Sequence, residues 1–334
     1  MLKLFQSIFG GKEEQGRYPE TLIEMAIERA VDGTYPRLRA MTGYKKRLRE
    51  PVIHAIDHVI ALVDRLPEPL PAISAEYGSD PRLAALFVSP EHMREVFGRD
   101  PVLSEFRDSH PEAGDGVTTL LVAKRQERNI FGVELQGEAV RRDVAQVSVG
   151  FDSHRLVDPH ADETEARRLL KRRAFDHLLG LALSRISEAK GERAALHQQR
   201  ELLNWKLRVL KKGGWNFEDR PSGPIDARAV QLELEEIEKQ MESLSVDDRT
   251  LSGQLDVVTD LLSNAEKQLW AEPVELHLDR MNIKRDASYP DVRRISLPEL
   301  HNARGENMAL LLVSVNPREL PQRDKSFANA DRLL

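Results

Sequence analysis

Cysteine is absent from the 334-residue chain. The protein therefore has no disulfide bond, no thiolate nucleophile and no metal site with sulfur ligands. Chains without disulfides are typical of reducing compartments. We accordingly predict a cytoplasmic protein.

Long apolar runs are missing as well. The best candidates, VIALV and ALLLVSV, fall far short of the roughly 18 residues that a membrane-spanning helix needs. We therefore expect no transmembrane segment.

Several sequence motifs of enzymes do not occur. The chain has no GxGxxG, GxxxxGK(S/T) or GxSxG pattern. These patterns mark dinucleotide binding, P-loop hydrolysis and the nucleophile of serine hydrolases, respectively. We predict no cofactor and favour a protein that is not an enzyme, while a catalytic group assembled from distant residues stays open.

Aromatic residues are scarce, at 5%, whereas charged residues reach 31% and the net charge is −6. This balance is typical of chains with long solvated helices. The length and the 40% hydrophobic content are enough for about two or three domains.

Residues 1–17 form a separate N-terminal segment in this interpretation. Leu2, Phe5, Ile8 and Phe9 share one face of a short helix. Residues 1–10 are therefore a candidate for peripheral contact with a membrane or with a partner protein. The alternative is an end that packs on its own domain or stays in solvent.

A helical domain is predicted over residues 18–110. Apolar residues recur every three or four positions in PETLIEMAIERAV and in EPVIHAIDHVIALVDRL. Three shorter helices should follow, because Asp80, Ser89 and Asp100 each precede a proline, which is the pattern of a helix cap and first turn.

An antiparallel β domain is predicted over residues 117–157 and 273–316, so the expected fold class is α+β. Both ranges are rich in β-branched residues with polar or glycine breaks. We expect all of these runs to share one sheet. The runs are VTTLLVAKRQ, NIFGVELQG, AVRRDVAQVSVGF, PVELHLDRMNIKR, VRRISLPEL and MALLLVSVN.

A long antiparallel coiled-coil hairpin, residues 162–270 with its tip at 213–225, is predicted to interrupt the β domain. Each arm has apolar residues at alternating spacings of four and three, the pattern of a heptad seam. The second arm has the cleaner pattern. Its seam residues are Val230, Leu234, Ile237, Met241, Leu244, Asp248, Leu251, Leu255, Val258, Leu262, Ala265 and Leu269.

The two arms carry opposite charge. Residues 162–212 contain 13 Lys/Arg and 7 Asp/Glu, whereas residues 226–270 contain 4 Lys/Arg and 11 Asp/Glu. Folding the arms together places Arg193 opposite Asp248. We predict a structural pair there, because an unpaired charge in an apolar seam is strongly unfavourable.

The tip of the hairpin contains two aromatic residues, Trp215 and Phe217, in the stretch KKGGWNFEDRPSGP. They would either fold back to seal the apolar seam or point outward as anchors for a partner. We treat both residues as partner-binding candidates.

Two basic runs suggest an alternative function. One is the segment 44–49, and the other is a cluster of cations at the start of the first arm. Clustered cations favour phosphate binding, so a nucleic-acid-associated factor is the second hypothesis. The anion-binding candidates in this cluster are Arg167, Arg168, Lys171, Arg172 and Arg173.

Two groups of residues are weak metal-site candidates. His54 and His58 lie one helical turn apart. The loop from Asp152 to Asp162 gathers further histidine and aspartate side chains, which suit divalent cations. A metal-dependent enzyme is thus the third hypothesis, with His277 or His301 as an added ligand. The candidates in the loop are Asp152, His154, Asp158 and His160.

The favoured function is a non-enzymatic cytoplasmic adaptor or scaffold. A long helical arm reaches partners away from the body of a protein and offers surface for self-association. Residues 317–334 are predicted to form a flexible tail.

Overall fold

The computed structural model describes residues 18–111, 114, 116–136, 139–211, 227–243 and 251–321. The chain divides into two compact units. Described residues of 56–175 and 265–321 form the first, here called the sheet unit, and those of 18–55 and 176–264 form the second, the arm unit. The division passes between Ala55 and Ile56, inside the region 18–110 that was predicted to be one helical domain.

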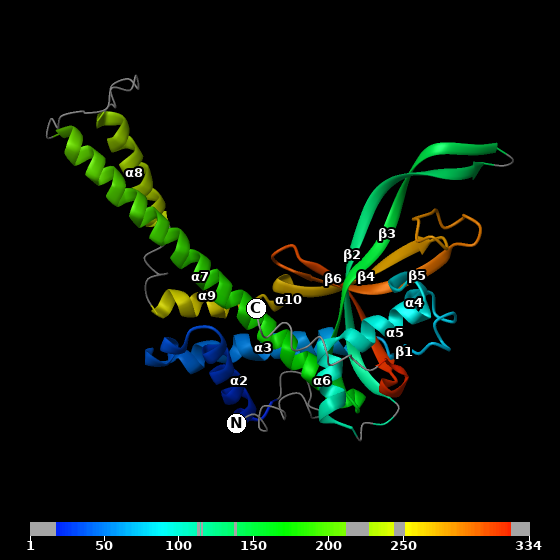
Figure 1. Ribbon diagram of the computed structural model, residues 1–334. Helices are drawn as coiled ribbons and strands as arrows, with labels where there is room; N and C mark the ends of the chain where they lie inside the picture. Colours follow the sequence, from blue (N-terminus) through cyan, green and yellow to red (C-terminus); the bar gives the residue numbers. More distant parts are fainter. Residues whose placement is uncertain are drawn as a thin grey trace, which may run out of the picture. The chain divides into compact units, whose positions relative to one another are not determined.

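The sheet unit contains a six-stranded sheet, drawn in Figure 1. Five strands are antiparallel in the order β3-β2-β6-β5-β4, and the short strand β1, Leu70–Pro71, pairs parallel to β6. Both predicted groups of strands therefore share one sheet, and the α+β class is confirmed at this level. The five antiparallel strands are β2 Val117–Gln136, β3 Ala139–His160, β4 Leu269–Leu278, β5 Arg293–Asn302 and β6 Asn307–Val315.

The strand boundaries correct three predictions. The first three predicted runs form only two long strands, because the polar stretch around Arg128 stays paired with β3. Strand β3 ends at His160, past the predicted limit of 157. Leu269, predicted as a seam residue of the second arm, instead opens β4 and pairs with Asn302.

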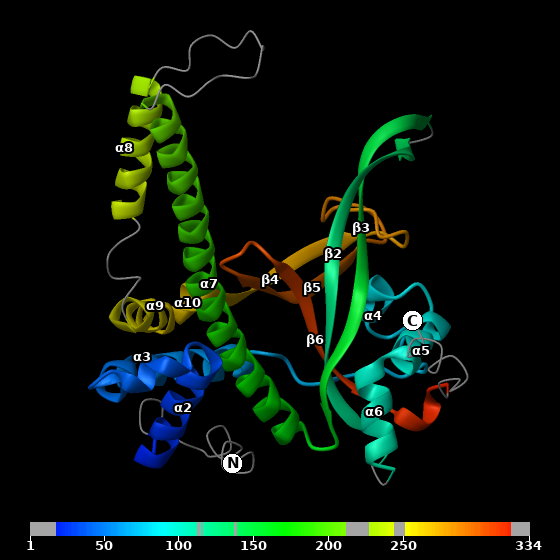
Figure 2. The ribbon, with the colours of Figure 1, turned by 60° about the vertical axis from the view of Figure 1, so that its left-hand side comes forward.

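Apolar side chains pack on both faces of the sheet, because successive residues of a strand point to opposite sides. On one face, Leu121 belongs to a core that includes α4 Pro81–Leu86, α5 Pro90–Arg99 and α6 Pro101–Ser109 (Figure 2). On the other face, Leu120 packs with Val63 near the end of α3, Tyr44–Asp64, and with Leu170 near the start of α7, Glu163–Lys211.

The three short helices begin where the sequence predicted. The side chain of Asp80 accepts a hydrogen bond from the backbone N–H of Arg82 at 2.8 Å, and that of Ser89 accepts one from His92 at 3.1 Å. Asp100 accepts two such bonds at the start of α6. These caps satisfy N–H groups that have no partner within the helix.

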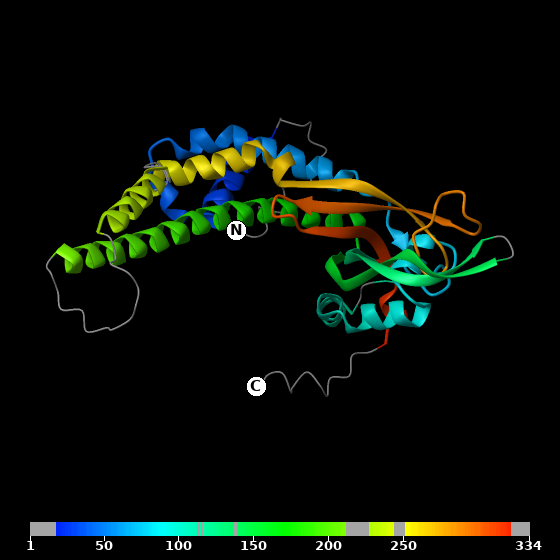
Figure 3. The ribbon, with the colours of Figure 1, turned by 90° about the horizontal axis from the view of Figure 1, so that it is seen from above.

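Strands β2 and β3 continue together beyond the rest of the sheet. Pairing of β2 with β6 stops at Ala123, whereas pairing with β3 runs on to Gln136. The part of the two strands from residue 124 to residue 147 is called the ribbon below, and Figures 1 and 3 show it running on past β6. At its base, Arg125 holds the buried carboxylate of Glu299 on β5 at 3.0 Å.

The start of the predicted flexible tail is docked on the sheet unit, which corrects that prediction. Residues Pro317–Glu319 form a short 3-10 helix, and Leu320 is buried in the core beneath α4–α6. The guanidinium of Arg94 donates to the carbonyl oxygen of Glu319 at 2.7 Å. The rest of the tail, 322–334, lies outside the described residues.

The arm unit is helical. Helix α2 packs closely on α7 at Gly33. A Cβ atom placed on Gly33 would lie 2.9 Å from Leu179 Cδ1, so a larger residue would not fit there without a shift. Arg29 and Asp176 link the same two helices by hydrogen bonds of 2.8 and 2.7 Å. The elements are α2 Glu20–Gly33, η1 Pro36–Ala40, α8 Ala227–Ser243, α9 Leu251–Ser263 and parts of α3 and α7.

Helices α7 and α8 lie side by side in the arm unit (Figures 1 and 2). Leu203 of α7 forms an apolar cluster with Val230, Leu234 and Ile237 of α8. The predicted second arm is not one described helix to residue 270. It comprises α8, α9 and the short α10, Ala265–Gln268, and residues 244–250 lie outside the description. None of the described helices is long and apolar enough to cross a membrane.

Candidate functional site

The segment predicted as a metal-binding loop belongs mainly to a strand. Residues up to His160 are part of β3, so neighbouring side chains point to opposite faces. His154 is held by its own contacts, since its Nε2 lies 2.9 Å from the carbonyl oxygen of Leu86 and its ring stacks on Phe87. Burial in this place lowers the pKa of His154.

The other members of the predicted loop have structural partners. Asp158, which has a positive φ of 52°, binds the guanidinium of Arg173 with two contacts of 2.7 Å. Asp162 accepts a hydrogen bond from the N–H of Glu165 at the start of α7, which lowers the pKa of the Asp162 carboxyl. The N–H of Asp162 donates to His160 Nδ1 at 3.0 Å.

The histidines outside β3 do not join these residues. His54 is exposed on α3, while His58 Nε2 lies 2.7 Å from the carbonyl oxygen of Leu269. His277 pairs with Arg294 in the sheet, and His301 stacks on a tryptophan of β4. Within the described ranges, no group of three His, Asp or Glu side chains is placed to hold a metal ion.

The basic cluster of α7 is engaged within the sheet unit. Arg167, 17% exposed, contacts Glu163 at 2.7 Å and donates to three backbone carbonyls. Arg168, 19% exposed, contacts Glu165. Lys171, 14% exposed, contacts Asp64 at 2.7 Å. Arg173 binds Asp158, as described above, and Arg172 likewise has a partner.

The basic run 44–49 has a similar role in the arm unit. Arg49 pairs with Glu20 at 2.8 Å, and Arg47 pairs with Asp256. The hydroxyl of Tyr44 donates to Glu28 at 2.6 Å, and burial together with this bond raises the pKa of Tyr44 to about 12. Both predicted phosphate-binding runs therefore link elements of the protein to each other.

The candidates at the far end of the hairpin are not placed. Trp215, Phe217 and Asp248 lie outside the described residues. Arg193 belongs to α7, but its side chain is also outside the description. The Arg193–Asp248 pair and the role of the two aromatics therefore stay predictions.

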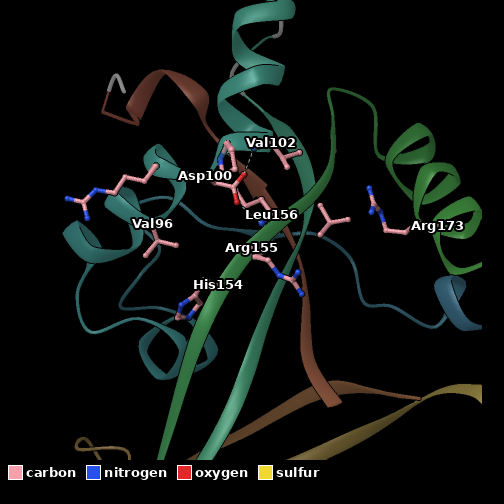
Figure 4. A pocket seen from close by; sticks show the side chains of 10 residues that line it. Val96, Asp100, Val102, His154, Arg155, Leu156 and Arg173 are labelled. Atoms are coloured by element: carbon pink, nitrogen blue, oxygen red, sulfur yellow. Dashed lines mark hydrogen bonds between the residues drawn. The ribbon is translucent and has the colours of Figure 1, made fainter. Parts of the chain in front are cut away.

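A cleft of about 380 Å³ lies along β3 in the sheet unit (Figure 4). Helices α5 and α6 supply Val96 and Val102 on one side of the strand, and α7 supplies Arg173 on the other. Asp100 and Leu156 form part of the lining, and the Asp100 carboxylate accepts the N–H of Leu156 at 2.9 Å.

The cleft combines apolar and cationic side chains. Arg99, Arg155 and Arg173 all line it and are exposed to solvent. Asp100 is 8% exposed, and its carboxylate accepts hydrogen bonds from three backbone N–H groups. This carboxylate is therefore largely occupied and has little capacity to bind a ligand in the cleft. Such a surface suits a segment that carries both carboxylates and aliphatic side chains.

Four of the exposed apolar side chains lie on the arm and the ribbon and were not singled out from the sequence. Leu202 of α7 and Leu232 of α8 are 52% and 60% exposed. Phe131 and Val133 on the ribbon are 79% and 59% exposed. The heptad pattern places the two leucines outside the seam, and this position was the sequence signal that could have identified them as exposed. The exposure of Phe131 depends instead on where the sheet ends, which the sequence pattern does not show.

We compared the chain with protein-family models, with curated proteins and with solved structures, and none of the three comparisons gave a match.

Proposed function

We propose that this protein is a non-enzymatic cytoplasmic adaptor or assembly protein whose helices α7 and α8 form an antiparallel coiled-coil arm that binds another protein. The observation that carries the proposal is the exposure of Leu202 and Leu232, at 52% and 60%, outside the cluster that joins the two helices. Complete burial of a leucine side chain is favourable by roughly 1.5–3 kcal/mol. A partner that covers both residues would gain from this burial.

The contacts between the helices support the coiled-coil part of the proposal. Leu203 and Leu207 of α7 cluster with Leu234 and Ile237 of α8, and all four follow the heptad spacing of the sequence. A pair of helices has one seam and leaves the outer face of each helix in solvent. The outer faces are therefore the surfaces on which a third helix or another partner would pack.

The two alternative hypotheses have less support. The cations proposed for phosphate binding are engaged with carboxylates and backbone carbonyls. Of the side chains proposed as metal ligands, those of His58, His154 and Asp158 are engaged in an ion pair or in contacts with carbonyl oxygens, and Asp162 caps α7. The residues that make these contacts thus have structural roles that account for their positions.

Site-specific photocrosslinking in cells that produce the full chain tests the proposal. A photoreactive phenylalanine analogue replaces Leu202 or Leu232, and in matched controls it replaces Gln199 or Gln231, which are also exposed on α7 and α8. We expect one discrete protein adduct from the leucine positions and much less of it from the controls. The proposal fails if no adduct forms, or if all four positions give the same adducts.

A further inference from the structure

We propose that two copies of this chain associate through the ribbon, by antiparallel pairing of their β2 strands about a two-fold axis at Phe131. This inference rests on the proposed function in one respect, namely that the protein takes part in an assembly. It names a second copy of the chain as the partner. It uses residues of the sheet unit and none of the α7–α8 arm.

The outer edge of β2 is open along the ribbon. Strand β3 occupies one side of β2, and β6 leaves the other side after Ala123. No described strand pairs with this side of β2 from residue 124 to residue 136. The outer edge of β3 is different, because Asn282 and Lys284 form backbone bonds with Val149 and Val147 there. The outer edge of β3 is thus covered near residues 147–149, whereas the outer edge of β2 offers free N–H and C=O groups to another strand over the whole described length of the ribbon.

One face of the ribbon carries apolar side chains of both strands, together with Glu127 and Asn129, and continues the core of the sheet unit. Phe131 lies opposite Ala145, and two positions further on Asn129 lies opposite Val147. The next pair on the same face is Glu127 with Val149, and Val149 is 1% exposed in the core beneath α4–α6. Towards the tip of the ribbon this face loses its helical cover, so Phe131 and Val133 become exposed.

On the opposite face of the ribbon, beside Phe131 along the strand, the side chain of Gln146 covers the backbone of β2. Gln146 takes the space beside Gly132, where a Cβ atom would clash with the Gln146 side-chain oxygen Oε1. The Gln146 amide also donates to the carbonyl oxygen of Val133 at 3.3 Å. Ile130, on this opposite face, is 37% exposed, whereas the more exposed Phe131 and Val133 share the other face.

The charge of the ribbon favours a protein strand as the partner. Residues 124–147 contain five Lys/Arg and four Asp/Glu, so the segment is close to neutral. Nucleic acids and anionic membranes attract strongly basic surfaces. An isolated two-stranded ribbon is only marginally stable, whereas a four-stranded sheet with a shared apolar face is more stable. Pairing of two ribbons forms such a sheet.

The sequence of β2 fits this pairing when the two-fold axis passes through Phe131. The two Phe131 rings then meet, Asn129 lies opposite the partner's Val133, and Arg128 lies opposite position 134, a glutamate in the sequence. Centring the axis on Asn129 would instead place Glu127 against Phe131. Centring it on Ile130 would place Glu127 against Val133. The Phe131 register places Glu127 against Leu135, so all three registers oppose this carboxylate to an apolar residue, and the Asn129 register also sets Lys124 against Glu134. We favour the Phe131 register because it alone brings the two exposed Phe131 rings together.

Disulfide trapping tests the interface and its register, since the chain has no cysteine of its own. Phe131→Cys should give a disulfide-linked dimer on mild oxidation, because opposed residues of paired strands lie within disulfide reach. Val88→Cys is the matched control, since Val88 is 89% exposed and lies outside the ribbon. We expect it to crosslink at least about tenfold more slowly.

A mixture of two single-cysteine variants reports the register. Asn129→Cys and Val133→Cys should crosslink to each other, whereas each alone should not. In the proposed register, identical positions 129 or 133 of the two copies are offset by four residues, about 13 Å, which exceeds disulfide reach. Crosslinking of each variant with itself, at the rate of the mixture, would overturn the register.

Sedimentation of the unmodified chain completes the test. We expect a species of twice 37.9 kDa at tens of micromolar and a monomer for Phe131→Glu, an exposed substitution that leaves the core intact. A monomeric wild type, or a dimer that Phe131→Glu does not weaken, overturns the inference. The double variant Leu202→Glu and Leu232→Glu should remain dimeric, which separates failure of the ribbon from failure of the arm.

Discussion

Asp100 joins helix α6 to strand β3 through a hydrogen bond of 2.9 Å from the backbone N–H of Leu156 to its Oδ2 atom. The other carboxylate oxygen, Oδ1, accepts the N–H groups of Val102 and Leu103 and so caps the helix. One buried side chain therefore fixes the start of α6 and satisfies a backbone donor of the edge strand. Both oxygens must act as acceptors for this arrangement to hold.

Asp100→Asn should destabilise the protein by about 2–3 kcal/mol, because an amide has one acceptor and its NH₂ group would face a backbone N–H. The free energy of unfolding in urea measures this effect. Ser89→Ala is the control, since the side chain of Ser89 contacts His92 and Glu91 of its own helix, and we expect its loss to cost about 1 kcal/mol. Equal losses in the two variants would contradict the double role of Asp100.

The cap of α6 was predictable from the sequence, whereas its contact with β3 was not. An aspartate before a proline is a local pattern, and local patterns located Asp80, Ser89 and Asp100 correctly. The bond to Leu156 joins residues 56 positions apart and depends on how α6 packs. Sequence periodicity alone carries no information about such a contact.

His154 should make the stability of the protein depend on pH near neutrality. Burial lowers its pKa below the ordinary value of 6.5, so the unfolded chain binds a proton more readily than the folded chain. The stabilisation is complete above pH 6.5 and is lost as the pH falls through the lower folded pKa. The free energy of unfolding should therefore decrease from about pH 7.5 to about pH 5.5, about one unit on either side of the ordinary pKa.

His154→Phe should reduce this pH dependence, because phenylalanine keeps an aromatic ring beside Phe87 and does not titrate. At pH 7.5 the variant should lose about 1 kcal/mol, since the contact with the carbonyl oxygen of Leu86 is gone. His54→Gln is the control at an exposed position. If the wild type and His154→Phe have the same pH profile, His154 is not the titrating group.

Arg167 should contribute more to stability than to binding of polyanions. It donates to the carbonyl oxygens of Val63, Leu66 and Pro67, which end helix α3 and begin the following loop. Arg167→Ala should lower the free energy of unfolding by about 2 kcal/mol. Arg173→Ala, at a side chain 61% exposed, should lower it by less than about 1 kcal/mol.

The same contacts predict no mobility shift of duplex DNA or RNA by the full chain at low salt. A shift that Arg167→Ala abolishes, in a variant that remains folded, would instead favour the nucleic-acid hypothesis.

The ribbon and the arm show why part of the candidate surface could not be predicted. The polar residues around Arg128 resemble a break between strands, because the β2 side chains of residues 127–130 are all exposed. Leu269 continues the heptad spacing, yet its backbone pairs with β5. A single apolar residue fits both a heptad seam and a β-strand, so its pairing in the folded protein decides which of the two it joins. Leu202 and Leu232 became candidates only when their exposure was known.

The most direct test of the arm as an interaction surface is the affinity of the full chain for the protein that photocrosslinks at Leu232. Three forms are compared by titration calorimetry: the wild type, the double variant Leu202→Glu and Leu232→Glu, and the double variant Gln199→Glu and Gln231→Glu. The last adds the same charge to neighbouring exposed positions and keeps both leucines. We expect the leucine variant to bind at least about tenfold more weakly and the glutamine variant to bind within about threefold of the wild type. Equal weakening in both variants, or none in the leucine variant, would contradict the proposed function.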